Sequence, residues 1–526
     1  MNYADLFRVT LPETALEVAA LIVLIVDLGF LRKAALKVRV AVAALLGVAG
    51  CGVALWAVSI QGRTLLRYGD FGTQVLLDPS GHAAIAEAAI LVLTALTLLL
   101  LIDSIFTRNA GEFVAIVLMT AAGGLLVAAA QDLLVIFVGL ELLSLGLYIL
   151  TAFAKGSGKS AEAAMKYYLF GGMSAAFLLF GFSYFYGLSG TTSLTLIHRA
   201  IALSGPSPLF YVAWIFVVAG LAFKIAAVPF HIWAPDTYEG APAPAAAFIA
   251  SVSKVASFAL LLSISMQWFL PAGEYSKTGF STGRWVRESF DTWPKAALAL
   301  LLVSAMSMIF GNLAALAQVS VRRLLAYSAI AHAGYILLGV AVYPLHFGQV
   351  DPSSVYNAEF LQTIRGVQST MYYVLTYGLT TIGAFGVVSV VERATGSDRL
   401  DSFCGLHRRN PLLAAVLLVL FLSLAGIPPL VGFWAKFNLF AAVLGVSAGP
   451  VPFGLVVLAV SLSAVSLYYY LQVLKRAYVI PAIDESPIKA HPVTMAVLLF
   501  IATVVVVLGC FPALLQNWIQ HFYPTM

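Results

Sequence analysis

Apolar residues along this chain gather in long runs that are separated by short polar stretches. A membrane-crossing helix needs about 20 mostly apolar residues, and about fourteen runs meet that requirement. These runs lie near 12–31, 38–60, 82–103, 111–129, 132–153, 164–188, 209–233, 241–267, 293–317, 322–343, 370–392, 411–445, 452–475 and 492–515. The pattern predicts an all-α polytopic membrane protein, and no strands are expected.

Two of the apolar runs are interrupted by proline. One contains "AAVPFHIWAPD" with Pro229, and the other contains "LAGIPPLVGFWAK" with Pro428 and Pro429. Proline removes a backbone donor and clashes with the preceding helical turn, and carbonyls freed in hydrocarbon must be satisfied by protein or water. Each break is therefore expected to line a cavity, and a simple proline kink is the alternative interpretation.

The two breaks occupy matching places in the chain. Each falls in the fourth helix of a five-helix group, the first spanning 111–267 and the second 293–475. Matching interruptions in two halves are typical of transporters with internal repeats. Because five is odd, the second repeat is expected to be inverted relative to the first. A three-helix segment, 1–110, would precede the repeats, and a C-terminal helix, 476–526, would follow them.

Composition and charge support the membrane class. The chain has 526 residues, of which 61% are hydrophobic and 10% charged, whereas soluble domains are about a quarter charged. The net charge of +5 is small and resides mainly in short loops, so it predicts topology and not nucleic-acid binding. The loop "LRKAALKVR" follows the first run and carries four basic residues. The positive-inside rule places this loop in the cytoplasm, so both termini are expected on the other side.

Four lysines fall inside the predicted spans. They are Lys166, Lys224, Lys254 and Lys436. A charge at mid-membrane costs roughly 2.5–3.5 kcal/mol, and such residues generally face the bundle interior and mark an ion path. The alternative is a lysine near a helix end whose ammonium group reaches the interface.

Two further polar residues sit in the middle of apolar runs. Glu141 lies in "LLVIFVGLELLSLGLYIL" and His332 in "VRRLLAYSAIAHAGYILLG". Each is either a relay member or a hydrogen-bonded packing residue. No metal is assigned, because neither His332 nor His231, which follows the first break, has a partner at metal-ligand spacing. No cofactor site is assigned either, because "KGSGKS" lacks the first glycine of a phosphate loop and no C-x-x-C is present.

Five stretches, taken together and in this order, resemble a known family. They are "GLELLSLGLYILTAF", "EAAMKYYLFGGMSAAFLLFGFSYFYGLSGTTSL", "LAFKIAAVPFHIWAPDTYEGAPAPAAAFIASVSKVASF", "VRRLLAYSAIAHAGYILLG" and "LSLAGIPPLVGFWAKFNLF". They are similar to the antiporter-like subunits of respiratory complex I, the proton-pumping NADH–quinone oxidoreductase. The forms "ELLSLGLYIL" and "AAMKYYLFGG" favour the N type, called subunit 2 in organelles. The resemblance is strong over about 110–475.

The resemblance implies roles for individual residues. Glu141 matches a membrane glutamate that pairs with the lysine of the first broken helix, Lys224. Lys254 matches the lysine of the following helix, and Lys436 the lysine of the second broken helix. The residues that the resemblance assigns to proton translocation are Glu141, Lys166, Lys224, Lys254, His332 and Lys436.

The resemblance also implies a setting. The chain would be a non-catalytic, proton-translocating subunit in a bacterial inner membrane. Flavin, iron–sulfur clusters and quinone would lie in or between other subunits, and this subunit would bind no cofactor. Its partners would be the M-type antiporter-like subunit, the small K-type and J-type subunits, and the lipid bilayer. A multi-subunit cation/proton antiporter, a related complex with another electron donor and a scaffold with buried charges are the competing hypotheses.

The charge pattern suggests how lysines would carry protons. A lysine with its ordinary pKa near 10.4 holds its proton at neutral pH. Burial generally lowers the pKa of a lysine, so that the proton is released more readily. Glu141 would act as a switch that stabilises charged Lys224 when close and releases the proton when distant. The expected route runs from Lys224 through Lys254 to Lys436 and then to the outside.

Overall fold

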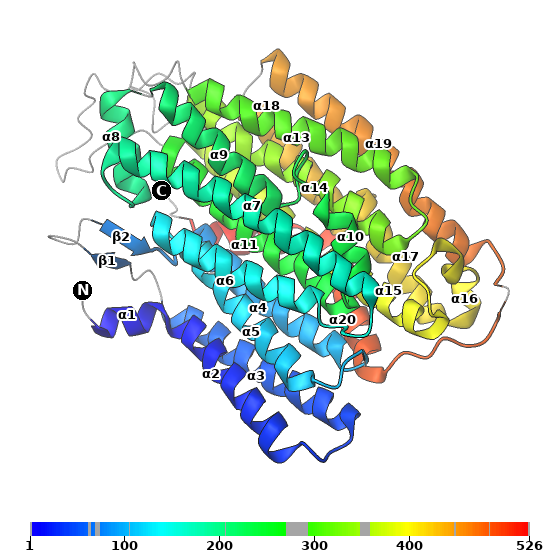
Figure 1. Cartoon of the computed structure of the whole chain (residues 1–526). Helices are drawn as coiled ribbons and strands as arrows, with labels where there is room; N and C mark the ends of the chain where they lie inside the picture. The colour runs from blue at the N-terminus through cyan, green and yellow to red at the C-terminus, as the bar shows by residue number, and fades with distance from the viewer. Residues whose placement is uncertain are drawn as a thin grey trace.

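The computed structural model describes residues 3–61, 65–68, 74–104, 106–205, 207–269, 293–347, 358–446, 449–482 and 484–523. Of the two longer connections between the predicted spans, near 268–292 and 344–369, residues 270–292 and 348–357 lie outside the described residues. The described part is almost entirely helical, as Figure 1 shows.

The helices of the predicted N-terminal segment, 1–110, and of the first predicted group, 111–267, are as follows. The segment comprises α1 (Tyr3–Val9), α2 (Leu11–Ile25) continued by the π-helical turn η1 (Val26–Phe30), α3 (Leu36–Gln61) and α4 (His82–Leu101). The first group comprises α5 (Ala110–Ala129), α6 (Leu133–Thr151), α7 (Gly158–Ser189), α9 (Pro208–Lys224), α10 (Trp233–Gly240) and α11 (Ala243–Phe269).

The second predicted five-helix group, 293–475, follows along the chain. It comprises α13 (Trp293–Leu316), α14 (Val321–Phe347), α15 (Ala358–Thr395), the short turns η4 (Leu400–Phe403) and α16 (Leu406–Arg409), α17 (Pro411–Ala425), α18 (Val431–Val446) and α19 (Pro450–Tyr478). The chain closes with α20 (Pro492–Cys510) and α21 (Ala513–His521).

The predicted fold class is confirmed. Among the described residues, eleven helices are long and apolar enough to cross a membrane, and α9, α17 and α18 are shorter apolar helices. Each of the fourteen predicted runs corresponds to one of these helices, to α2 with η1, or to a broken pair. The protein is therefore a multi-pass membrane protein.

Two helical runs are interrupted where the prolines fall. The first interruption separates α9, which ends at Lys224, from α10, which begins at Trp233. The second separates α17, which ends at Ala425, from α18, which begins at Val431. Val228–Pro229 and Pro428–Pro429 are cis peptide bonds. Both interruptions lie next to a lysine of the apolar core, Lys224 or Lys436.

The expectation of no strands was wrong. The strands β1 (Leu66–Tyr68) and β2 (Gln74–Leu77) form an antiparallel hairpin. The hairpin is anchored to the bundle, because Leu77 bridges Ala130 and the Gln131 N–H donates to the Leu76 carbonyl. A short helix, α8 (Leu194–Ser204), was also not predicted. Both elements are too short to produce a long apolar run, so a search for membrane spans passes over them.

Three helices form the interior of the bundle. In the most apolar 18-residue stretch of α11 every residue is buried, against 94% in α14 and 83% in α15. The corresponding values are only 33% for α7 and 28% for α19, so these two helices lie at the periphery. Polar side chains on α11, α14 and α15 are therefore shielded from lipid and surrounded by protein.

The loops gather alternately at two ends of the bundle. The β1–β2 hairpin and α8 lie at one end, which we call the hairpin end, and α16 lies at the other (Figure 1). Loops near 103–106, 154–159, 239–244, 317–323 and 389–399 line one cavity at that other end, which we call the charged end. This arrangement follows from helices that cross the bundle one after another.

Candidate functional site: a row of buried polar side chains

Side chains from both halves of the molecule hold the first break in place. The Val228 N–H, freed from the helix, donates to Ser307 Oγ of α13 at 2.9 Å. The Trp233 indole N–H, at the start of α10, donates to the Phe223 carbonyl at the end of α9, at 3.1 Å. These polar groups at the break are therefore satisfied by protein, as hydrocarbon surroundings require.

Lys224, the last residue of α9, faces two polar side chains of α6. Its Nζ lies 2.6 Å from Ser144 Oγ and 3.7 Å from Glu141 Oε1. The lysine side chain is 5% exposed and that of Glu141 is 27% exposed. The ammonium group therefore has a hydrogen bond to a neutral hydroxyl and a charged carboxylate just beyond hydrogen-bond distance.

Lys254 lies at the centre of the molecule and contacts both halves. From the fully buried α11 it donates to the Ile225 carbonyl at 3.2 Å and to the Ala329 carbonyl of α14 at 2.8 Å. The first carbonyl belongs to the residue that follows Lys224. No carboxylate of the described residues pairs with Lys254, which is stabilised by carbonyl dipoles instead.

Lys436 sits in α18 beside the second break and is surrounded in a similar way. Its Nζ donates to the Leu424 carbonyl at 3.2 Å, to the Ala425 carbonyl at 2.9 Å and to Ser463 Oγ of α19 at 2.8 Å. The two carbonyls are available because α17 ends there. Within the described part of the chain, Lys436 also has no carboxylate in ion-pair contact.

Aromatic side chains connect Lys254 with Lys436 through His332. The ring of Tyr377 lies 5.9 Å from Lys254 Nζ and 4.8 Å from the His332 ring. The ring of Tyr335 lies 5.9 Å from the His332 ring and 5.5 Å from Lys436 Nζ. The structure thus brings five of the six predicted site residues into one row, in which the partly exposed Glu141 is followed by the buried Lys224, Lys254, His332 and Lys436.

His332 has hydroxyl neighbours on both sides of its ring. Its Nδ1 lies 3.0 Å from the Tyr373 hydroxyl, and its Nε2 lies 3.4 Å from the Tyr470 hydroxyl. Tyr470 is hydrogen-bonded in turn to Ser328. Each ring nitrogen therefore faces a hydroxyl that can either donate or accept a hydrogen bond.

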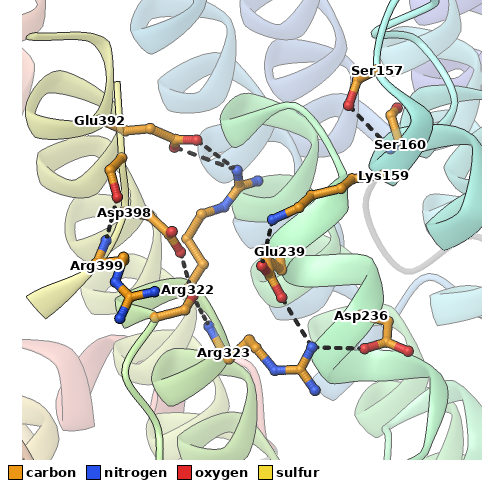
Figure 2. A network of polar contacts seen from close by, with 12 residues as sticks. Ser157, Lys159, Ser160, Asp236, Glu239, Arg322, Arg323, Glu392, Asp398 and Arg399 are labelled. Atoms are coloured by element: carbon orange, nitrogen blue, oxygen red, sulfur yellow. Dashed lines mark hydrogen bonds and ion pairs between the residues drawn. The ribbon is translucent and has the colours of Figure 1, made fainter. Parts of the chain in front are cut away.

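Lys166 lies apart from this row, in a charged cluster shown in part in Figure 2. Its side chain is 40% exposed, and its Nζ lies 2.7 Å from both Glu162 and Asp236. Asp236 also pairs with Arg323 at 2.8 Å, and Arg323 reaches Glu239 at 2.9 Å. The role of Lys166 in proton transfer stays a prediction that this position does not favour.

The charged cluster determines the ionisation of Asp236 on α10, outside the long apolar spans. Partial burial raises the pKa of Asp236, but the hydrogen bond from Lys166 and the charge of Arg323 outweigh it. The net result is a pKa below the ordinary value. The cluster thus fastens α10, the helix after the first break, to α7 through Lys166 and to α14 through Arg323.

A cavity of about 1010 Å³ opens beside this cluster at the charged end. Its lining includes Glu239, Arg322, Arg323 and Glu392. Arg322 is buried and pairs with Glu392 at 3.2 Å (Figure 2). It also donates to the Ala241 carbonyl. Charged groups near the first break are therefore accessible to water from this end.

Sequence reasoning missed the hydroxyl groups that complete the row. Ser144 and Glu141 are three residues apart in α6, and Tyr373 and Tyr377 are four apart in α15, so each pair shares a helix face. That spacing was visible in the sequence. Hydroxyl-bearing residues are nevertheless frequent in membrane helices, and only the contacts with Lys224 and His332 distinguish these.

The comparisons with known proteins agree on a family. Residues 130–346 and 354–466 match the protein-family model described as "NADH:quinone oxidoreductase/Mrp antiporter, TM". The chain is 44% identical to NADH-quinone oxidoreductase subunit N 2 of Acidobacterium capsulatum, over 99% of both chains.

Solved structures give the same result. The fold is similar to a chain of respiratory complex I from Thermus thermophilus, with a TM-score of 0.73, 32% identity and coverage of 96% of this chain and 98% of that one. It is also similar to a chain of the Mrp complex from Dietzia, with a TM-score of 0.74 over 97% and 96%, but at 21% identity, which shows the fold alone. The chain belongs to the family of NADH:quinone oxidoreductase and Mrp antiporter transmembrane subunits, among the relatives named subunit N.

Proposed function

We propose that this chain is a membrane-arm subunit of an NADH–quinone oxidoreductase and carries protons across the membrane. The names of its relatives support the complex. The observation that carries the transport function is the row from Glu141 through Lys224, Lys254 and His332 to Lys436, in which Lys254 bonds to the carbonyl of the residue after Lys224. Buried ionisable groups in membrane helices mark ion paths, because their cost must be offset by function.

In this proposal Lys224, Lys254 and Lys436 pass protons in that order. Lys224 is loaded from the charged end, where the cavity lined by Glu239 and Arg323 lies at the end of α10, the helix after the first break. Carbonyls at the break stabilise the ammonium of Lys254 through Ile225, and His332 with its tyrosines spans the distance to Lys436. Moving one charge against about 100 mV costs roughly 2.3 kcal/mol. That free energy would come from quinone reduction elsewhere in the complex.

The setting of the subunit is part of the same proposal. It would lie in a bacterial inner membrane with its charged end in the cytoplasm and both termini on the other side. Basic residues near that end, such as Lys37, Lys159 and Arg323, support this orientation. Its partners would be the M-type, K-type and J-type subunits. Flavin, iron–sulfur clusters and quinone would belong to other subunits.

We also propose that the two groups, 111–267 and 293–475, are inverted repeats. In the first group Asp132, which precedes α6, bridges Ser193 after α7. In the second group Ser320, which precedes α14, bridges Arg399 after α15. The first bridge lies beside the hairpin end, and the second lines the cavity of the charged end. Equivalent contacts at opposite ends support an inversion.

The test is Lys254→Ala in the assembled complex, with Lys159→Ala as control. Lys159 is 77% exposed and pairs with Glu239, so its loss removes a positive charge without removing a member of the row. We expect NADH-driven proton translocation in sealed vesicles to fall at least about tenfold for Lys254→Ala and to stay normal for Lys159→Ala. Normal pumping by Lys254→Ala would overturn the proposal.

A further inference from the structure

Ser144 is the side chain that contacts the ammonium group of Lys224 most closely. It lies on α6 one turn after Glu141, is buried, and its Oγ is 2.6 Å from Lys224 Nζ. Its own hydroxyl proton is directed elsewhere, because Oγ donates to the Leu140 carbonyl at 2.5 Å. The lone pairs of the oxygen are therefore turned toward the lysine.

Glu141 does not hold the ammonium group in the same way. Its Oε1 is 3.7 Å from Lys224 Nζ, and among the described residues this buried oxygen has no hydrogen-bond partner. If both acceptors were equally placed, the ammonium group would bond to the carboxylate, because a charge-assisted hydrogen bond is shorter and stronger than a bond to a neutral oxygen. The serine competes with the carboxylate for the same protons.

We propose that Ser144 is a positioning residue that keeps the Lys224 ammonium out of direct contact with Glu141. This inference rests on the proposed function, because it explains how a lysine next to a carboxylate gives up its proton. A direct ion pair in a low-dielectric interior holds the proton firmly. A neutral acceptor satisfies the ammonium without adding a negative charge, so Lys224 can pass its proton toward Lys254.

Three substitutions of Ser144 separate this role from simple packing. Ser144→Ala removes the acceptor, Ser144→Cys fills the space but accepts hydrogen bonds only weakly, and Ser144→Thr keeps the hydroxyl. Positioning predicts slow pumping for the alanine and cysteine variants and recovery with threonine. Packing alone predicts normal pumping for the cysteine variant.

The matched control is Ser174→Ala. Ser174 is also buried and also contacts α9, but its hydroxyl donates to the Gly220 carbonyl and not to the lysine. A defect that follows from any lost serine at the α9 surface would appear in this variant too. We expect its pumping to stay within about twofold of the unmodified complex, a small change in barrier.

The experiment measures NADH-driven proton translocation per assembled complex in sealed vesicles. We expect about a tenfold loss for Ser144→Ala and Ser144→Cys, which corresponds to ~1.4 kcal/mol. In a Glu141→Gln background, where no carboxylate competes for the ammonium group, Ser144→Ala should lower proton translocation by less than a further factor of about two. Near-normal pumping by Ser144→Ala or Ser144→Cys would overturn the inference. If Lys224→Ala pumps poorly at the same time, the proposed function still stands; if it pumps normally, both fail.

Discussion

The two helix breaks place their lysines in different surroundings. Lys224 at the first break faces a carboxylate at 3.7 Å and a serine hydroxyl at 2.6 Å. Lys436 at the second break faces two backbone carbonyls and the hydroxyl of Ser463. Each ammonium group bonds to a serine, but only the first has a charged neighbour among the described residues.

The difference shows two ways of keeping a buried ammonium group stable. A carboxylate is on a side chain with rotatable bonds, so the interaction of Glu141 with Lys224 can change as the protein moves. The carbonyls of Leu424 and Ala425 are fixed by the end of α17 and give a constant field. The first break is thus suited to loading and release, and the second to holding a proton at a fixed affinity.

The largest effect is expected from removing the charge at the first break. Glu141→Gln keeps the size of the side chain but leaves the Lys224 ammonium without its compensating charge. We expect proton translocation to fall about tenfold or more, with normal amounts of assembled complex on a native gel. A complex that fails to assemble would indicate that Glu141 has a structural role instead.

At the second break, the next largest effect is expected from a change in backbone conformation. Gly426 has φ +86°, and an added Cβ would lie 3.2 Å from Lys436 Nζ. Gly426→Ala should cost about 1–2 kcal/mol of stability and displace the lysine from its carbonyls, which lowers Tm and slows pumping severalfold.

The control for Gly426→Ala comes from the first break. Ala226 there has φ +58°, so Ala226→Gly relieves strain while it increases the entropy of the unfolded chain. We expect these two effects to cancel within about 1 kcal/mol. An unchanged Tm and normal pumping in Gly426→Ala would contradict the idea that the lysine depends on this turn.

A smaller effect is expected from Ser463→Ala. Two carbonyl acceptors remain for Lys436, so pumping should fall less than about threefold, in contrast to the loss expected for Ser144→Ala. Ser466→Ala is the matched control, because Ser466 is buried on the same helix and donates to the Ser463 carbonyl and not to the lysine. An effect of Ser463→Ala as large as that of Ser144→Ala would remove the distinction between the two breaks.

The smallest effect is expected at the charged cluster. Asp236→Asn loses ion pairs that are partly exposed to water, which are worth about 0–1 kcal/mol. Because the pKa of Asp236 is lowered in the folded protein, its contribution exists at neutral pH and is lost as pH falls through that lowered pKa. Thermal melting of the purified complex at neutral and acidic pH measures this. If Asp236→Asn lowered the free energy of unfolding by more than about 2 kcal/mol, the cluster would be essential for the fold.

Much of the architecture was predictable from the sequence. Runs of about 20 apolar residues determine the spans, and Pro229 and Pro428 mark the two interruptions. The hairpin that begins at Leu66 and the helix that begins at Leu194 were not predicted, because contacts with the bundle, and not local composition, determine such short elements.

The candidate site was predictable only in part. Charges in apolar runs stand out, so Lys224, Lys254 and Lys436 were found directly. Lys166 was placed in the same class because α7 was expected to begin near 164. The helix begins at Gly158, and Glu162 and Asp236 pair with the lysine near the charged end. Which carboxylate meets which lysine depends on packing that no local pattern encodes.

The central claim, that the buried row carries protons, is tested most directly by Lys224→Ala in the assembled complex. The quantity to measure is the number of protons translocated per electron in sealed vesicles, with NADH oxidation followed in parallel. The account predicts a lower ratio with the complex fully assembled, because the row is cut at its first lysine. An unchanged ratio at a normal rate of NADH oxidation would contradict it.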